Sequence, residues 1–334
     1  MKIDTDYLKG GAQKEYYAPS DVEACNCPLC GQNNFKKIYQ ERGNLGIVQC
    51  RVCNLIYVNP RLKNPEKVYW GDANRYFEEA RLIFQGKAAH HRDPNYLRDL
   101  TRIKSYKGNG RFLDIGTNMG FFLRMALNRG WELYGVEPSP SLSEFARRYF
   151  NLNVKTAFLE ESGFDEKYFD VICMTDVFEH ITNPRKFLAE VRRILKDDGI
   201  VYIKVPNGKY NLFKLFIAKL LRKTGSYNIF DSYEHVIHYT GSTLKRMLQG
   251  CGFKVLEMTF DRPIQIPIWH EYVGHYYQYP TPFLFDIKRQ TLRWLLYALA
   301  KIEYFLWRKH IGYLSPNIIV VCGKKNDSEV TSPI

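Results

Sequence analysis

The sequence predicts an α/β fold in which helices cover both faces of a mostly parallel β-sheet. Three observations support this prediction. An apolar run ends at Asp114, a turn containing Gly116 and Gly120 follows, and a helical apolar pattern then begins. The segment 131–137 reads as a second strand that ends in a carboxylate. Beyond it, strand-like and helical patterns continue to alternate, which is typical of parallel sheets.

The composition is that of a folded chain with a basic surface. Its 334 residues suffice for one large domain with a small one, or for two domains. The net charge of +13 favours an anionic partner such as nucleic acid, a phospholipid surface or a phosphate-bearing substrate, unless it only solubilises an aromatic-rich chain. Residues 1–20 lack a signal-peptide core, and no apolar run reaches the roughly 18 residues of a membrane span. We therefore expect a cytoplasmic protein, at most in contact with the inner face of the membrane.

Two C-x-x-C pairs predict a structural zinc site. Nineteen residues separate the pairs, which lets four thiolates surround zinc as a tetrahedron and close a small ribbon. Four sulfur ligands leave no open coordination position, so the ion would stabilise the segment and take no part in chemistry. Free thiols are the alternative. We assign residues 1–24 to an N-terminal arm and 25–62 to the ribbon, with Cys27, Cys30, Cys50 and Cys53 as the expected ligands.

The segment 63–109 has a helical pattern and reads as a linker that packs on the main domain, which we place at 110–323. Two insertions, 206–239 and 262–316, interrupt this domain, and 324–334 form a tail. Long insertions near a ligand edge usually shape a binding pocket. Within the domain we expect a helix from Ser139, a strand over 151–157, a strand over 169–176, a helix from Asn183 and a strand over 200–205.

The turn after Asp114 predicts a nucleoside site. The helix N-terminus behind the turn offers N–H groups to an anion, and Glu137 is placed to accept hydrogen bonds from two ribose hydroxyls. The glycine spacing of 116–121 does not match the G-x-G-x-x-G fingerprint of dinucleotide-binding folds. A nicotinamide enzyme is therefore the least favoured interpretation.

An acid stands two residues before the first glycine of the turn. In this feature and in the segments 164–172, 176–181 and 240–253, the chain resembles the class I S-adenosylmethionine (SAM)-dependent methyltransferases. The resemblance implies a Rossmann-like seven-stranded sheet whose last, antiparallel strand is 317–323. The preceding ribbon makes the chain similar to methyltransferases that act on sugars, including sugar C-methyltransferases and enzymes of surface-polysaccharide and antibiotic pathways. In that family a helical segment often closes over the cofactor, so 63–109 could also be a lid.

The resemblance also implies the cofactor site. Asn118 stands where the family's loop has its middle glycine, a replacement that requires a left-handed backbone. Phe158 and Leu159 would flank the adenine, whose amino group would meet the backbone, Glu160 or Glu161. The residues expected to bind SAM are Asp114, Gly116, Thr117, Asn118, Gly120, Glu137, Phe158, Leu159, Thr175 and Asp176.

Histidines near the ligand edge are the candidates for removing the acceptor's proton, because imidazole titrates in the useful range. His180 follows the fourth strand, and the pair Glu234-His235 precedes the next helix. The sugar C-methyltransferases carry a similar pair but have a tyrosine where this chain has Ser232. We therefore expect His180, His235 and Glu234 to be catalytic.

Two amphipathic segments lie within the insertions. The segment 209–223 interleaves leucines and phenylalanines with lysines, and 292–308 is rich in aromatic residues. Such helices suit an anionic membrane surface, a lid on their own domain or an oligomer contact.

The sequence thus predicts a zinc-ribbon methyltransferase that moves a methyl group from SAM to a hydroxyl, or a carbon, of a nucleotide-linked or lipid-linked sugar. One alternative is an RNA methyltransferase that grips phosphates with its ribbon and basic surface. A second alternative is a SAM-binding scaffold without catalytic activity.

Overall fold

The computed structural model describes residues 17–41, 44–65, 73–85, 88–90, 92–220, 229–261, 272–273, 276–278, 302 and 315–325. Several predicted features lie wholly or largely outside these ranges. They are most of the N-terminal arm, the end of the segment 209–223, nearly all of the insertion 262–316 with the amphipathic segment 292–308, and the tail beyond 325.

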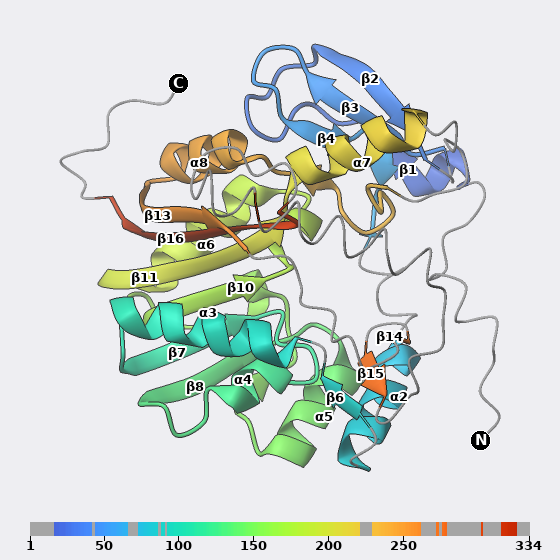
Figure 1. Ribbon diagram of the computed structural model, residues 1–334. Coiled ribbons are helices and arrows are strands. Elements are labelled where there is room, and N and C mark those ends of the chain that lie inside the picture. Colours follow the sequence, from blue (N-terminus) through green and yellow to red (C-terminus); the bar gives the residue numbers. More distant parts are fainter. Residues whose placement is uncertain are drawn as a thin grey trace.

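A seven-stranded sheet forms the centre of the molecule (Figure 1). Its order is β13-β16-β11-β10-β7-β8-β9. Only β16 runs antiparallel to its neighbours, β11 and β13, whereas the pairs within β11-β10-β7-β8-β9 are parallel. This is the α/β methyltransferase sheet that the sequence predicts. The strands are β7 (Gly110–Ile115), β8 (Trp131–Val136), β9 (Val154–Lys155), β10 (Phe169–Thr175), β11 (Leu195–Pro206), β13 (Phe253–Phe260) and β16 (Asn317–Lys324).

Two strands differ in length from the prediction. The third strand, β9, is only two residues long, and both of its residues pair with β8. It does not begin at residue 151, because Asn151 takes a left-handed conformation (φ 51°) that ends the preceding helix. The fifth, β11, begins earlier than residue 200, because the helix before it ends at Ile194 and Leu195 already pairs with Phe169 across an irregularity in the ladder.

Helices cover both faces of the sheet, and successive strand residues alternate between the two cores. Phe112 packs with α3, α4 and α5, whereas its neighbour Leu113 packs with α6 and α8. Side chains of the ribbon join the second core, so the ribbon lies on the α6 and α8 side. The helices are α2 (Ala73–Phe84), α3 (Asp93–Tyr106), α4 (Phe121–Met125), α5 (Pro140–Phe150), α6 (Pro184–Ile194), α7 (Gly208–Leu220) and α8 (Gly241–Gly250).

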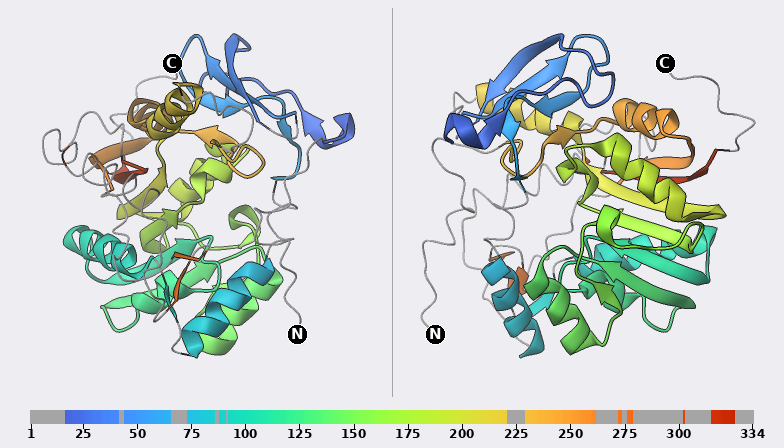
Figure 2. Two further views of the ribbon diagram at one scale, coloured as in Figure 1. Left: turned by 45° about the vertical axis from the view of Figure 1, so that its right-hand side comes forward. Right: turned by 180° about the vertical axis from the view of Figure 1, so that it is seen from behind.

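The N-terminal ribbon is not independent of the main domain. Its strands β2 (Phe35–Gln40), β3 (Gly46–Cys50) and β4 (Ile56–Val58) form an antiparallel sheet whose fourth strand, β12 (Ile237–His238), comes from the first insertion. Figures 1 and 2 show the ribbon beside α7. The sheet therefore combines two segments that lie far apart in the sequence.

Helix α7 presents its apolar face to the ribbon. Leu212 and Leu215 pack in one cluster with ribbon residues such as Ile47. Phe216 and Leu220, further along the same helix, remain exposed at 62% and 67% of their accessible area. Much of the apolar face that the sequence suggests for a membrane or a partner is thus covered within the chain.

A buried carboxylate ties the insertion to the ribbon. Glu41, which is 5% exposed, accepts backbone N–H bonds from Ile229 at 2.8 Å, from Phe230 at 2.6 Å and from Ser232 at 2.9 Å. Three donors on one carboxylate satisfy both the buried charge and the backbone of the loop. This loop leads directly into Glu234 and His235.

Short elements complete the described structure. A strand of the second insertion, β15, pairs with β6 of the linker and places the two segments side by side. None of the helices among the described residues is both long and apolar enough to cross a membrane. These short elements are η2 (Pro19–Asp21), β1 (Val22–Glu23), β5 (Arg61–Leu62), β6 (Ala88–His90), η3 (Leu159–Glu161), η4 (Phe178–His180), β14 (Tyr272–Val273) and β15 (Tyr276–Gln278).

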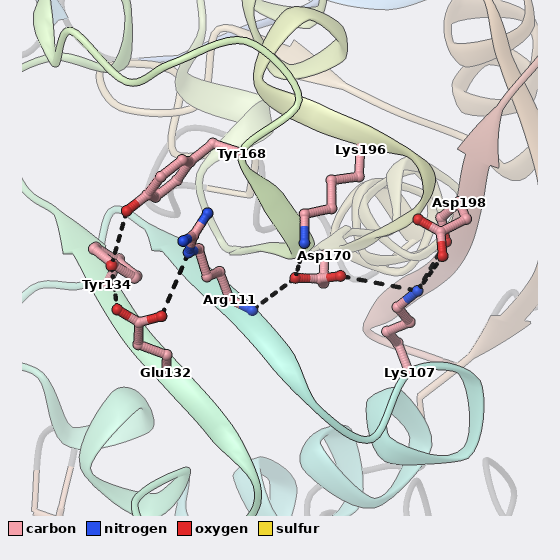
Figure 3. Close-up of polar contacts among 8 residues, drawn as sticks. All are labelled: Lys107, Arg111, Glu132, Tyr134, Tyr168, Asp170, Lys196 and Asp198. Atoms are coloured by element: carbon pink, nitrogen blue, oxygen red, sulfur yellow. Dashed lines mark hydrogen bonds and ion pairs between the residues drawn. The ribbon is translucent and has the colours of Figure 1, made fainter.

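Ion pairs and hydrogen bonds hold the edge of the sheet where β7 and β10 begin (Figure 3). Asp170 accepts bonds from Lys196 Nζ at 2.7 Å and from the Arg111 backbone N–H at 2.8 Å. Burial alone would raise the pKa of Asp170, but these donors hold it below its usual range. Gly110 is required beside this carboxylate, because a Cβ there would lie 2.4 Å from the Asp170 carboxyl carbon. These contacts therefore stabilise the end of the sheet at which the parallel strands begin.

Replacing Glu41 by alanine should lower the free energy of unfolding by at least about 2 kcal/mol, because three buried N–H groups would lose a charged acceptor. Denaturant unfolding of the Glu41→Ala chain measures this loss. Glu166→Ala, at an exposed turn, is the matched control and should stay within about 0.5 kcal/mol of the parent. Equal stabilities of the two variants would show that Glu41 does not anchor the loop.

Candidate active site

A cavity of about 420 Å³ opens at the carboxyl ends of β7, β8 and β10. This is the position where open parallel sheets bind ligands. Most of the expected cofactor and catalytic residues line it, namely Gly116, Asn118, Glu137, Phe158, Leu159, Asp176, His180 and Glu234. Asp114, Thr117, Gly120, Thr175 and His235 are not part of its lining. The lining also includes residues that sequence reasoning did not single out, among them Pro65, Val136, Pro138, Val177, Thr182, Asn183 and Lys186.

The turn after β7 requires its unusual residues. Gly116 has φ 69°, and a Cβ on it would lie 2.6 Å from Val177 Cγ2. Asn118 takes the left-handed conformation, φ 52°, that its position demands. Gly120 has φ 83° and faces Leu152 Cδ1, which a Cβ would approach to 2.7 Å. Gly120 therefore permits tight packing behind the turn, in addition to shaping the loop.

Glu137 lines the cavity, and backbone N–H groups hold its carboxylate in place. Its Oε2 accepts the Asn118 N–H at 2.9 Å, and its Oε1 accepts the Ser139 N–H at 2.9 Å. Each oxygen keeps a further lone pair for a hydroxyl donor. Burial raises the pKa of Glu137 to about 6, and the two N–H donors oppose this rise.

Asp114 supports the turn from behind the cavity. It is 3% exposed and accepts the Thr117 hydroxyl at 2.7 Å, which links the end of β7 to the loop. Burial raises the pKa of Asp114 to about 7, and the nearby Glu137 adds to the rise. Two carboxyl groups with raised pKa values give the site a dependence on pH just below neutrality.

Asp176 directly follows β10 and lines the cavity from a left-handed backbone position, φ 54°. It forms an ion pair with Arg92, at the start of α3. Burial would raise the pKa of Asp176, but the Arg92 guanidinium and the Lys204 ammonium lower it below its usual range. The carboxylate is therefore charged at neutral pH. Sequence reasoning did not find Arg92, because only the fold brings α3 to the end of β10.

A histidine–carboxylate cluster lies next to Asp176 and consists of Glu179, His180, Glu234 and His235. The two imidazole rings have centroids 4.8 Å apart. Glu179 Oε1 lies 3.9 Å from His180 Nε2 and 4.0 Å from His235 Nε2. His180 Nδ1 lies 2.9 Å from the Glu234 carbonyl oxygen. The fold thus brings together the three residues expected to be catalytic and adds Glu179, which the sequence analysis did not single out although it directly precedes His180.

Burial dominates the electrostatics of this cluster. It lowers the pKa of His180 to about 3 and that of His235 to about 4, so both rings are neutral at pH 7. Burial, followed by the charge of Asp176, raises the pKa of Glu179 well above its ordinary value. Glu179 is 1% exposed, and neither of its carboxylate oxygens has a hydrogen-bond partner among the residues that the structure describes.

The four expected zinc ligands come together in the ribbon. Cys27 Sγ and Cys53 Sγ lie 3.3 Å apart, Cys30 Sγ and Cys50 Sγ lie 3.5 Å apart, and all four sulfurs lie within 4.8 Å of one another. Zn–S bonds of about 2.3 Å put tetrahedral sulfurs about 3.8 Å apart, so the donor set fits a tetrahedral zinc ion. Cys25 is not one of the four, and its Sγ instead lies 3.7 Å from the Val58 carbonyl oxygen.

We expect removal of zinc to unfold the ribbon, because thiolate–metal bonds replace most of the core that so small a segment lacks. The purified chain should contain one zinc per molecule at the four cysteines, and Cys53→Ser should lose it. Elemental analysis measures the content, and protease sensitivity within residues 25–62 reports the unfolding. Cys25→Ser is the control and should keep the metal, whereas equal zinc content in both variants would contradict the assignment.

Replacing Glu137 by alanine should weaken SAM binding by about tenfold to a hundredfold, because one or two hydrogen bonds to a charged acceptor are lost. Calorimetric titration measures the affinity, and circular dichroism checks the fold. The parent chain should itself lose affinity between about pH 7 and pH 5, as Glu137 takes up a proton below its pKa of about 6. Glu144→Ala, on the exposed side of α5, serves as the control, and unchanged affinity in Glu137→Ala would exclude this pocket.

Comparison with known proteins agrees with this geometry. Residues 88–258 match the family described as methyltransferase domain. The chain is 22% identical over 191 residues to an uncharacterized protein of Methanocaldococcus jannaschii, which covers 57% of this chain and 82% of that protein. It is 21% identical over 201 residues to the ubiquinone biosynthesis O-methyltransferase of Histophilus somni, covering 55% of this chain and 81% of that protein.

Among solved structures, the chain is similar to one chain of the complex between the Haloferax volcanii Trm112 methyltransferase activator and a methyltransferase. The TM-score is 0.49 and the identity 18%, and the match covers 77% of this chain and 96% of that chain. The family match spans half of the sequence and includes the turn, Glu137, Asp176 and the helix α8. The chain belongs to the methyltransferase-domain family and is a SAM-dependent methyltransferase.

Proposed function

We propose that the chain transfers a methyl group from SAM to a hydroxyl oxygen of a sugar in a nucleotide-linked or lipid-linked glycan intermediate. The single observation that carries the proposal is the histidine–carboxylate cluster beside the cavity. A hydroxyl group must lose a proton as it is methylated, and this cluster supplies imidazole nitrogens and carboxylate oxygens to receive it. Burial makes both imidazoles weaker bases than usual, since it lowers the pKa of His180 and of His235. Relatives named as O-methyltransferases support transfer to oxygen.

The two sides of the cavity would bind different substrates, SAM on one side and the acceptor on the other. Gly116, Asn118 and Glu137 would hold the methionine and ribose parts of SAM, and Phe158 would stack near the adenine. SAM supplies a methyl group on a positively charged sulfur. The sulfur keeps the bonding electron pair when an oxygen attacks in line. The negative charge of Asp176 favours a sulfonium at that end of the cavity.

The acceptor would enter on the side of His180 and Glu234, which both line the cavity. Thr182, Asn183 and Lys186 lie along the same wall and offer hydrogen bonds to an acceptor rich in hydroxyl groups. The exposed Phe216 and Leu220 of α7 suit the lipid-linked form of such an acceptor. Transfer to carbon is less favoured, because Ser232, where the sugar C-methyltransferases have a tyrosine, is 1% exposed and lies away from the cavity lining.

A second candidate acceptor is a phenolic hydroxyl, since several relatives are named as ubiquinone biosynthesis O-methyltransferases. Both acceptors present a hydroxyl oxygen and need the same proton acceptor. They differ in shape and polarity, because a phenol requires an apolar slot and a sugar requires polar partners along its edge.

We expect S-adenosylhomocysteine to form with nucleotide-linked or lipid-linked sugars and the product to carry an O-methyl group. Mass spectrometry after incubation with sugar nucleotides, glycolipids, polyprenylated phenols and RNA measures the outcome. Asn183→Ala should raise the KM for the sugar at least about threefold with little effect on SAM affinity, whereas Glu144→Ala should change neither. Methylation confined to phenols or to RNA would refute the sugar assignment.

A further inference from the structure

We propose that Glu179, His180 and His235 form a binding site for a divalent transition-metal ion, separate from the four cysteines of the ribbon. The three side chains come from two segments, the turn after β10 and the insertion before β12. Their ligand atoms lie within 4.8 Å of one another. Two imidazoles and one carboxylate are a donor set that suits Zn²⁺, Co²⁺, Mn²⁺ or Fe²⁺.

The first argument is the buried carboxylate. Glu179 is 1% exposed, and within the described part of the chain both of its oxygens lack a hydrogen-bond partner. A carboxylate in that state costs several kcal/mol unless a proton or a cation compensates it.

The second argument is the orientation of the two rings. Each directs Nε2 toward Glu179 Oε1, at 3.9 Å for His180 and 4.0 Å for His235. His180 Nδ1 lies 2.9 Å from the carbonyl oxygen of Glu234. Metal-binding histidines use the other ring nitrogen in this way, since a carbonyl acceptor fixes the tautomer that leaves the lone pair on the metal side.

The distances fit an ion after a small adjustment. Ligand atoms bound at about 2.0–2.2 Å to one ion lie roughly 3–3.5 Å apart. Side-chain movements of less than about 1 Å would therefore close the present separations onto a metal. The gap is too wide for hydrogen bonds between the groups, so no existing bond has to break.

The charges around the cluster favour a cation. Asp176 and Glu234 act on Glu179 with the same sign and raise its pKa, while Arg92 opposes them. Lys214, on α7, is the other positive group that acts on His235. Of the basic groups around these carboxylates, Arg92 is already paired with Asp176, and Lys204 is paired with Asp99 and Asp261. A cation at Glu179 would bring charge of the opposite sign to the cluster.

The site rests on the proposed function only for its role in catalysis. An ion bound there would lie beside His180 at the cavity wall and could hold the acceptor's hydroxyl oxygen, lowering its pKa. His180 and His235 would then be ligands, and Glu234 would receive the proton as the O–CH3 bond forms and the S–CH3 bond breaks. Metal binding itself requires neither SAM nor an acceptor.

Titration with Co²⁺ of the full-length chain that carries one zinc per molecule, at the four cysteines, tests the site. We expect one additional Co²⁺ per chain, with d–d absorption but without the thiolate-to-cobalt charge-transfer band that the cysteine site would produce. Glu179→Gln removes the charge with little change of shape, and His235→Asn removes a ligand. Each should weaken Co²⁺ binding at least about tenfold. Glu144→Gln is the matched control and should bind as the parent does.

Absence of the additional Co²⁺ in the parent chain would overturn the proposal, and so would unchanged affinity in the Glu179→Gln variant. Thermal unfolding shows whether each variant is folded, and the parent titration remains decisive if both variants unfold. Failure of the sugar assay with intact Co²⁺ binding would count only against the proposed acceptor. Loss of Co²⁺ binding with intact sugar methylation would count only against the metal site.

Discussion

The position of the histidine–carboxylate cluster depends on one residue, Val236, whose backbone N–H and carbonyl oxygen both form hydrogen bonds to other segments. Its carbonyl oxygen accepts the N–H of Val58 in the ribbon at 3.0 Å, and its own N–H donates to the carbonyl oxygen of Glu179 at 3.0 Å. The next two residues continue as β12 along the ribbon strand β4. The ribbon, the insertion and the turn after β10 thus share one backbone connection. Because His235 directly precedes Val236, the position of that imidazole depends on the fold of the ribbon.

This connection explains why a closed, non-catalytic metal site would accompany a methyltransferase domain. Zinc at the cysteines would hold β3 and β4 in place, and β4 holds β12. Glu41, which follows β2, also helps to position this insertion, because its carboxylate accepts backbone N–H bonds from the loop 229–232. The ribbon is therefore best understood as part of the wall that supports the histidine–carboxylate cluster.

Buried carboxyl groups have lowered or raised pKa values according to the end of the sheet at which they lie. At the far edge, Asp170 has several donors and a lowered pKa (Figure 3). At the ligand edge, Asp114, Glu137 and Glu179 are buried with too few donors, and the pKa of each is raised. Strongly perturbed groups of this kind gather at sites of binding and catalysis, where a ligand completes them.

The sequence by itself determined the sheet, the turn and the cysteine quartet, because local patterns suffice to recognise each of them. Alternating strands and helices, Gly116 before a helix, and two C-x-x-C pairs need no distant contact to be recognised. The left-handed Asn118 also followed from its place in the loop. Only the tertiary structure decided which distant segments meet. It brought Arg92 to Asp176, β12 to the ribbon, and Glu179 to His235. Such contacts depend on packing between elements separated by many residues, and no local periodicity encodes them.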